Sequence, residues 1–292
     1  MRVVLPELKD QKALFSYLKS NRKSLIAQKC SSQIKSENFD YGCISLKANS
    51  KDKIGSEVTK SFSVKAELRD DEIQVDAIAN MAGWADSYMD VLIPDCWDRT
   101  IKEKGASNKQ LIYHLKNHDY STDAIIGSRV QMRSEYMDLA TFNIKSDIKQ
   151  GQALIGNSIV KKKYDEKCFH LYSDDEIKQH SIGLRYIKIF LCMNSDEEDH
   201  SYEKGNWDKY YKYVINKDTV DSAGFFWAVT EIKLVEYSAV LYGANELTTV
   251  QETSKNIEEN EPSKDTHGAE QEPVKTIQDE TSEVDFFKQI KI

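Results

Sequence analysis

The sequence predicts an α+β fold that is mainly β-sheet with flanking helices, and three observations support this prediction. Apolar and polar residues alternate in residues 62–68 and 73–79 with the period of half-buried strands. Apolar residues instead recur at helical spacing in residues 7–29. The chain has 292 residues and an apolar share of 40%, enough for one sizeable packed domain with extensions.

The first 60 residues read as an extension of the main domain. Residues 7–29 predict an amphipathic helix, and residues 30–60 are rich in Ser, Lys and Asn, which is typical of a linker. The apolar residues of the helix are Leu14, Phe15, Leu18, Leu25 and Ile26.

Residues 61–248 carry the patterns expected for the domain. The strands at 62–68 and 73–79 predict a hairpin because Arg69–Glu72 between them is polar and short. Residues 150–163 predict a helix. The buried side of that helix would carry Ala153, Leu154, Ile159 and Val160. The other expected strands are Leu111–Leu115, which ends near His118, Tyr136–Ile144, His180–Phe190, and Phe225–Leu241 as one or two strands.

Two polar segments do not follow these patterns. Residues 192–224 are too long for an ordinary connection and predict either a flexible surface insertion or a hairpin that uses Tyr210, Tyr211, Tyr213 and Val214. Periodicity is lost after Asn245. We therefore expect residues 249–292 to form a disordered acidic tail that ends in the short apolar motif of residues 284–292.

Charge and composition narrow the function classes. Residues 1–60 hold 12 Lys and Arg against 6 Asp and Glu, whereas residues 250–292 hold 5 Lys against 11 Asp and Glu. This asymmetry indicates intermolecular contacts, contact between the two ends, or simple solvation of mobile ends. The basic residues are not interleaved with aromatic residues, so we expect no nucleic-acid site.

Apolar runs and cysteines bear on the compartment. No apolar run approaches the length of a membrane span, and residues 1–7 lack the apolar core of a signal peptide, so we expect no membrane association. The five cysteines are scattered without a Cys-x-x-Cys motif, which predicts neither a disulfide framework nor a zinc knuckle. A reducing cytoplasm fits this usage.

Three segments contain candidate catalytic residues. The first runs from Leu111 to Asp119 and is followed by Ile126-Gly127; it places His118 just past an apolar strand. The second, residues 180–184, places Ser181 in a strand before a glycine, and the third, residues 233–245, contains a carboxylate. A serine hydroxyl is a poor nucleophile at neutral pH, a histidine can take its proton, and a carboxylate can orient the histidine.

These segments together resemble the phage prohead proteases of the HK97 type. The motifs read Asn117-His118-Asp119 with Ile126-Gly127, then Ser181-Ile182-Gly183-Leu184, then Glu236-Tyr237-Ser238-Ala239-Val240 with Ala244-Asn245. The resemblance covers about residues 62–248. The chain departs from the family at Leu184, where an aromatic residue is usual, and in the long polar stretch before the last strands.

The resemblance implies a serine endopeptidase with Ser181 as nucleophile, His118 as general base and Glu236 as the third member. It also implies a β-barrel protease domain similar to the herpesvirus assembly proteases, with a short helix at Pro94–Lys104 that Asp95 would cap. No cofactor or metal is implied. The implied substrates are the scaffold or scaffolding segment of the phage capsid and the protease's own termini, and the implied location is the assembling prohead in the host cytoplasm. Partners would be the major capsid protein and scaffold, and a homo-oligomer is possible.

Several residues compete with the three members. His114 has the same strand parity as His118, so spacing alone does not separate the two histidines, and a core or groove-lining role is the alternative for His114. Glu231 competes with Glu236. His180 is adjacent to Ser181 and therefore points to the opposite face, which favours packing over catalysis. Asp119 is expected to fix its own turn, and Arg185 is a candidate for substrate contact. His200 and His267 follow Ser181 in the chain, but both are poorly placed for a third member.

Two other functions remain open at this stage. A metal hydrolase would use His114 and His118 with Cys168 and His170, but Leu115 stands where the zinc motif on a helix needs Glu. The other is a catalytically inactive capsid scaffolding protein built on the protease fold. The basic first 60 residues and the acidic tail favour this alternative.

Overall fold

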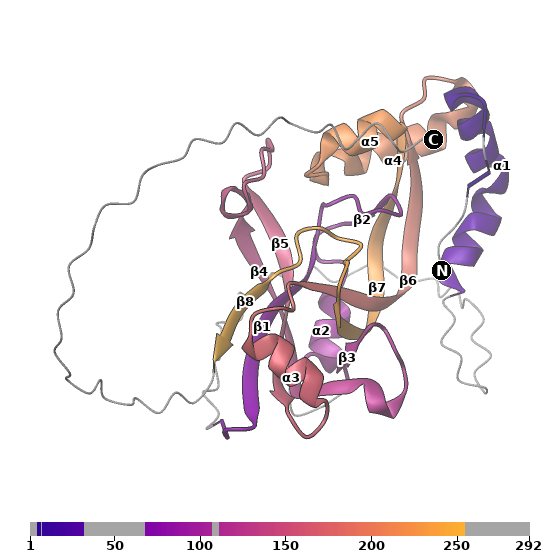
Figure 1. Ribbon diagram of the computed structural model, residues 1–292. Coiled ribbons are helices and arrows are strands. Elements are labelled where there is room, and N and C mark those ends of the chain that lie inside the picture. The colour runs from indigo at the N-terminus through magenta and orange to yellow at the C-terminus, as the bar shows by residue number, and fades with distance from the viewer. Residues whose placement is uncertain (1–4, 7, 32–67, 107–110, 255–292) are drawn as a thin grey trace, which may run out of the picture. The chain divides into compact units, whose positions relative to one another are not determined.

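The computed structural model describes residues 5–6, 8–31, 68–106 and 111–254, and within them it forms an eight-stranded sheet with helices around it (Figure 1). All the elements given below belong to one unit of the chain. The strands are β1 (Glu72–Met81), β2 (Asp90–Leu92), β3 (Tyr113–Lys116), β4 (Ile125–Asp138), β5 (Gln150–Lys161), β6 (Gln179–Met193), β7 (Phe225–Val240) and β8 (Val250–Ser254).

The helices of the described residues cover parts of this sheet. They are α1 (Gln11–Cys30), α2 (Asp98–Lys104), α3 (Glu166–Ser173), α4 (Ser201–Tyr210) and α5 (Lys217–Ala223). Short 3-10 turns lie at Thr122–Ala124, Leu139–Phe142, Glu198–His200 and Tyr211–Tyr213. None of the helices in the described ranges is both long and apolar enough to cross a membrane.

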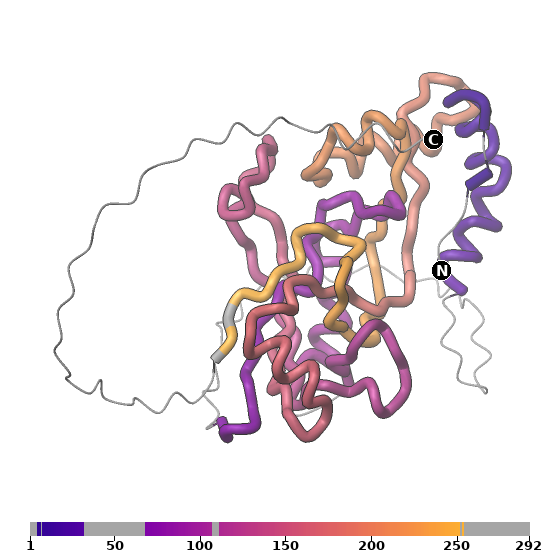
Figure 2. Tube along the Cα trace, in the orientation of Figure 1, coloured from indigo at the N-terminus to yellow at the C-terminus, as the bar shows by residue number. Residues whose placement is uncertain are grey.

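Strand β7 is the centre of the sheet. It pairs with β6 in antiparallel register over its whole length, and Figure 2 shows the two traces running side by side. Strands β2 and β3 both pair with β7 in parallel, β2 near its start and β3 near its end. The antiparallel strands β4, β5, β1 and β8 then continue the sheet from β3. The last part of β7 is therefore flanked by strands on both sides, which restricts where its side chains lie.

The side chains of this central region divide between two faces. One face contributes to an apolar core that α3 covers, with Phe169 and Tyr172 of the helix packed against Ile126 and Ala239 of the sheet. The other face carries Ser181 and Gly183 of β6 opposite Ser238 and Glu236 of β7, and the two β6 residues line a cleft described below. This division places the residues of the three sequence motifs.

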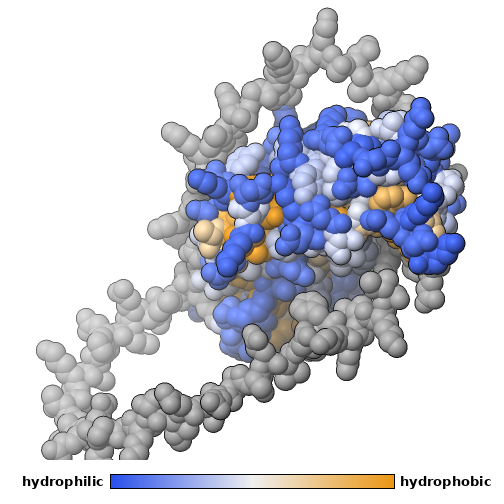
Figure 3. Space-filling view, turned by 90° about the horizontal axis from the view of Figure 1, so that it is seen from above, coloured by the Kyte–Doolittle hydropathy of each residue, from blue (hydrophilic) through white to orange (hydrophobic). Residues whose placement is uncertain are grey.

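The polar segment 192–224 was expected to be a flexible insertion or a hairpin, and both expectations are wrong. It completes β6 and then forms α4 and α5. Trp207, Tyr210 and Val214 recur at helical spacing and pack, with Val220, against Phe226 of β7. The surface on the side of these helices is mostly hydrophilic (Figure 3). A few large aromatic residues therefore pack this segment against the sheet, although its average composition is polar.

The helix expected at residues 150–163 is also wrong, because this segment is β5. Residues 151–156 are buried without alternation, as in a strand that is covered on both faces. A short apolar run of this kind cannot be distinguished from a buried helix by periodicity. Gly156 fits the strand because a Cβ there would lie 2.8 Å from the ring of Tyr237.

The expected cap of the next helix is a further error. Helix α2 starts at Asp98 rather than Pro94, its N-cap residue is Trp97, and no side chain caps it. Asp95 has a positive φ of 70° and its Oδ1 accepts a hydrogen bond from Gln152 Nε2 at 2.7 Å. The carboxylate therefore joins the loop to β5 instead of the helix.

The remaining expectations divide into three groups. The helix at 7–29 and the strands at 73–79, 111–115, 180–190 and 225–241 are confirmed, the last as a single strand. The strand expected at 136–144 is only the end of β4, followed by a 3-10 turn. The strand at 62–68, the linker at 32–60 and the tail from 255 lie outside the described residues, but Val250–Ser254 pairs with β1 as β8.

Candidate active site

Ser181 lies on β6 with its neighbours set by the register with β7. Ser181 is paired with Ser238, and Gly183 with Glu236. Residues that face each other across two strands have side chains on the same face. Ser181, Glu236 and Ser238 therefore share one face of the sheet, while His180, of opposite parity, is buried on the other face, as expected from the sequence.

His118 reaches the same face through an unusual turn. Strand β3 ends at Lys116, and both Asn117 and His118 have left-handed backbone conformations, with φ of 55° and 54°. The turn is fixed to β7 because the Asn117 N–H donates to the Ala239 carbonyl at 2.9 Å and the His118 N–H donates to Ser238 Oγ at 3.2 Å. Non-glycine residues in this conformation are uncommon and cost free energy, so tertiary contacts must maintain the turn.

The imidazole of His118 is held by Glu236. Its Nδ1 lies 2.7 Å from Glu236 Oε1, and the other carboxylate oxygen accepts a 2.6 Å hydrogen bond from the Ser238 hydroxyl. Glu236 is 1% exposed, whereas the His118 side chain is 35% exposed. A carboxylate can only accept, so in the neutral ring the proton lies on Nδ1 and Nε2 carries the lone pair.

Gly183 leaves the space that Glu236 occupies. A Cβ at this position would lie 2.1 Å from Glu236 Oε1 and 2.8 Å from the Tyr120 hydroxyl. Burial, and next the Glu236 charge, raises the pKa of Tyr120. The glycine two residues after Ser181 is thus required by the carboxylate on the neighbouring strand.

Ser181 and His118 line one cleft, which we call the site cleft. Its volume is about 540 Å³, and Tyr120, Gly183 and Tyr186 are also among its lining residues. No hydrogen bond joins the side chains of Ser181 and His118, although both are described. A second cavity of about 490 Å³ also includes Tyr120, and it adds basic residues to the surroundings of the site. The basic residues that line it are Lys104, Arg185 and Lys233.

His114 lies on the opposite side of the sheet in a buried polar cluster. Its Nδ1 is 2.8 Å from Ser158 Oγ, its Nε2 is 3.0 Å from the Tyr172 hydroxyl, and that hydroxyl is 2.7 Å from His180 Nε2. Burial lowers the pKa of His114 well below its ordinary value and that of His180 to about 3. Both rings are therefore neutral at pH 7, and their hydrogen bonds join neighbouring elements within the core. The shared parity of His114 and His118 does not place them together because the left-handed turn ends the strand.

The remaining candidates have partners outside the site cleft. Glu231 forms ion pairs with Lys188 and with Arg99, the latter at 3.5 Å. Asp119 accepts from the Ser121 N–H at 2.8 Å and fixes its own turn, as the sequence predicts.

The candidates for a metal or for a histidine third member lie elsewhere. His200 Nδ1 lies 2.8 Å from Ser195 Oγ next to α4. Cys168 and His170 lie on α3, and in the part of the chain that the structure describes no group of three or more His, Cys, Asp or Glu residues converges as a metal site. His267 is outside the described residues.

Sequence reasoning missed residues that support the site. Ser238 bridges the His118 backbone and Glu236, and its signal was its position two residues after Glu236 on the same strand face. Asn117 belongs to the motif around His118, but sequence reasoning assigned no separate role to it or to Tyr120. No protein-family model, curated protein or solved structure matches this chain. The geometry of the site therefore carries the functional argument.

Proposed function

We propose that this protein is a serine endopeptidase of the phage prohead type, which cleaves the scaffold of an immature capsid and its own termini. The observation that supports it best is that the buried Glu236 is bound to His118 Nδ1, while His118 and Ser181 line the same cleft. A carboxylate, an imidazole and a hydroxyl in this arrangement are the three parts of acyl transfer by serine.

The proposed reaction gives each of the three residues one role. His118 Nε2 takes the proton of Ser181 Oγ as the oxygen attacks the substrate carbonyl, and the imidazolium then gives that proton to the leaving amine. Glu236 stabilises the imidazolium because its carboxylate is buried and close. Water hydrolyses the acyl-serine with the same base. Catalytic hydrogen bonds are often long in free enzymes, so the Ser181–His118 contact is expected to shorten when substrate binds.

The finer fold is part of this proposal. The resemblance implies a β-barrel like that of the herpesvirus assembly proteases, with the capsid protein and scaffold as partners inside the prohead. Five of the seven pairings between named strands are antiparallel, which agrees with the mainly antiparallel sheet of such a fold. Enclosure with the substrate would raise its local concentration, so moderate affinity would suffice.

The test is co-expression of the full chain with the neighbouring capsid gene, followed by mass spectrometry of the fragments. The proposal predicts capsid or self-cleavage by wild type, none with Ser181→Ala, and wild-type cleavage with Ser128→Ala as a matched strand-serine control. Intact proteins in the wild-type sample would favour the alternative, an inactive scaffolding protein on the same fold. Complete inhibition by a chelator would also contradict the proposal.

A further inference from the structure

One end of the site cleft is acidic and is filled by a lysine from α1. Asp86, Asp90 and Tyr186 line the cleft together with Ser181, and we call these three residues the acidic subsite. The Tyr186 hydroxyl donates to Asp90 Oδ2. Lys29 Nζ lies 2.5 Å from Asp90 Oδ1, and the two side chains are 4% and 1% exposed.

The lysine is bound as a cationic ligand would be bound. Its ammonium lies 5.6 Å from the ring centre of Tyr186 and 5.5 Å from that of Trp227, in addition to its contact with Asp90. Aromatic faces attract cations within about 6 Å. Asp86 adds a second carboxylate, whose Oδ1 accepts from the N–H groups of Tyr88 and Asp90 at 2.8 and 3.0 Å. A carboxylate pair with two aromatic rings suits one basic side chain.

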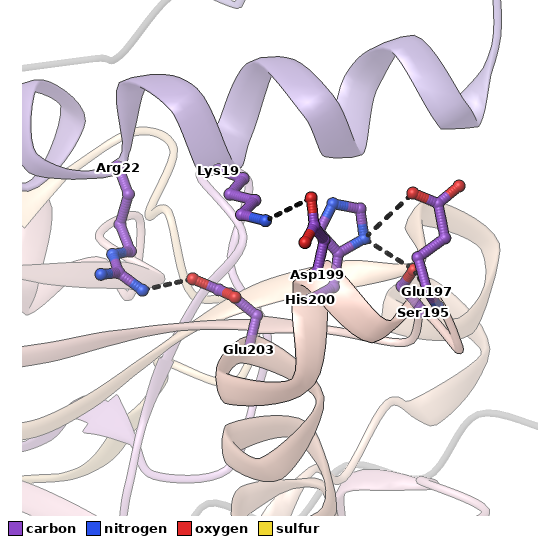
Figure 4. A network of polar contacts seen from close by, with 7 residues as sticks. All are labelled: Lys19, Arg22, Ser195, Glu197, Asp199, His200 and Glu203. Carbon is purple, nitrogen blue, oxygen red and sulfur yellow. Dashed lines mark hydrogen bonds and ion pairs between the residues drawn. The ribbon is translucent and has the colours of Figure 1, made fainter.

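The rest of α1 is held by buried apolar residues and by ion pairs of unequal strength. Its buried residues are Phe15, Leu18, Leu25 and Lys29. Figure 4 shows Lys19 and Arg22 directed from α1 toward Asp199 and Glu203. The Lys19–Asp199 pair, at 3.3 Å, is largely exposed, and exposed pairs contribute little and weaken with salt. Glu203, in contrast, is buried, so Arg22 is the ion-pair partner on which the docking of α1 depends most.

We propose that the acidic subsite binds a lysine or arginine side chain of the substrate, and that Lys29 occupies it as an intramolecular competitor until α1 is displaced. This inference rests on the proposed function. Tyr186 lies five positions after Ser181 on β6, which corresponds to roughly 16 Å at about 3.3 Å per residue. An extended substrate would therefore place its basic side chain about four or five residues from the scissile bond. A tethered competitor has a high effective concentration, so the full chain would cleave slowly while α1 is docked.

Binding to full-length Ser181→Ala protein tests this inference without requiring cleavage. The probe is Nα-acetyl-lysine N-methylamide, compared with its norleucine analogue by titration calorimetry. We expect no detectable binding with Lys29 present. With Lys29→Ala added, we expect the lysine probe to bind at least tenfold more tightly than the norleucine probe, and Asp90→Asn to remove that preference.

Two further variants keep the test decisive if Lys29→Ala does not fold. Arg22→Met leaves Lys29 and Asp90 intact but weakens the docking of α1, so weak lysine-specific binding should appear. Lys12→Met removes an exposed pair with Glu197 and should match the parent protein. If n-butylamine binds the Lys29→Ala protein but the lysine probe does not, Lys29–Asp90 is only a buried structural pair and the inference is overturned. If no variant binds the lysine probe, it is equally overturned, whereas the proposed function is tested separately by cleavage.

Discussion

Replacing Glu236 with glutamine should nearly abolish cleavage without unfolding the protein. The amide has the shape of the carboxylate but lacks its charge, and its NH₂ group can donate to His118 Nδ1. The ring proton would then move to Nε2, the nitrogen that must accept the proton of Ser181. Loss of the corresponding carboxylate in serine proteases costs about 10⁴-fold in turnover, or about 5 kcal/mol of transition-state stabilisation.

The structure indicates why no other group would compensate. Glu236 is 1% exposed and both of its oxygens have partners, His118 at 2.7 Å and Ser238 at 2.6 Å. Water therefore has little access to the side chain at position 236 and would not replace the lost charge there. The other candidate carboxylate, Glu231, lies five residues before Glu236 on β7 and forms ion pairs with Lys188 and Arg99.

The assay compares initial cleavage rates of wild type, Glu236→Gln and Glu231→Gln on one capsid-derived substrate, with thermal unfolding measured in parallel. Glu231→Gln is the matched control and should keep most of the activity. If Glu236→Gln cleaves within threefold of wild type while folded, then the carboxylate does not orient the base and the three-residue assignment is incorrect.

Three further predictions use other parts of the site. Gly183→Ala should reduce cleavage about as strongly as Glu236→Gln, because the new Cβ would lie 2.1 Å from Glu236 Oε1. Gly205→Ala is the control and should be active, because no atom lies within 4 Å of its new Cβ. Equal cleavage rates for the two variants would argue against the close approach of Gly183 and Glu236. Asp86→Asn should change the pH dependence of unfolding, because burial, and next the charge of Asp90, raises the pKa of Asp86 to about 7 from 3.8. The stability from this raised pKa is fully present below about pH 4 and is lost as pH rises through about 7, so denaturant titrations should show a flatter curve for the variant between these values. His114→Ala should lower the free energy of unfolding by about 3 kcal/mol, since it removes a buried, hydrogen-bonded ring. A variant that is fully stable but has no cleavage activity would contradict the structural role of His114.

Strand β1 was predictable because its first residues alternate between half-buried and fully buried positions. Strand β7 does not alternate around Glu236, where residues 236–239 are all buried, and the shared face of Glu236 and Ser238 follows from strand parity alone. Strand β5 was misread as a helix since both of its faces are covered, and alternation then disappears. The helices of residues 192–224 were missed because a few aromatic contacts decide their fold while polar residues dominate the composition.

The candidate residues of the site were chosen from the sequence, but their geometry was not predictable. The resemblance selected His118 over His114, whereas parity treated them alike. What separates them is the pair of left-handed residues at Asn117 and His118, which local sequence does not reveal. The contact of Lys29 with Asp90 joins residues 61 positions apart, and only the packed structure brings them together.

The most direct test of the central claim is the reactivity of Ser181 toward a fluorophosphonate, which phosphonylates serines activated by a histidine. Mass spectrometry of the labelled full chain should locate one adduct on the peptide that contains Ser181. The adduct should form at least 1,000-fold more slowly in His118→Ala and at the normal rate in Ser128→Ala. Equal labelling of wild type and His118→Ala, or labelling only at another serine, would contradict the claim that His118 activates Ser181.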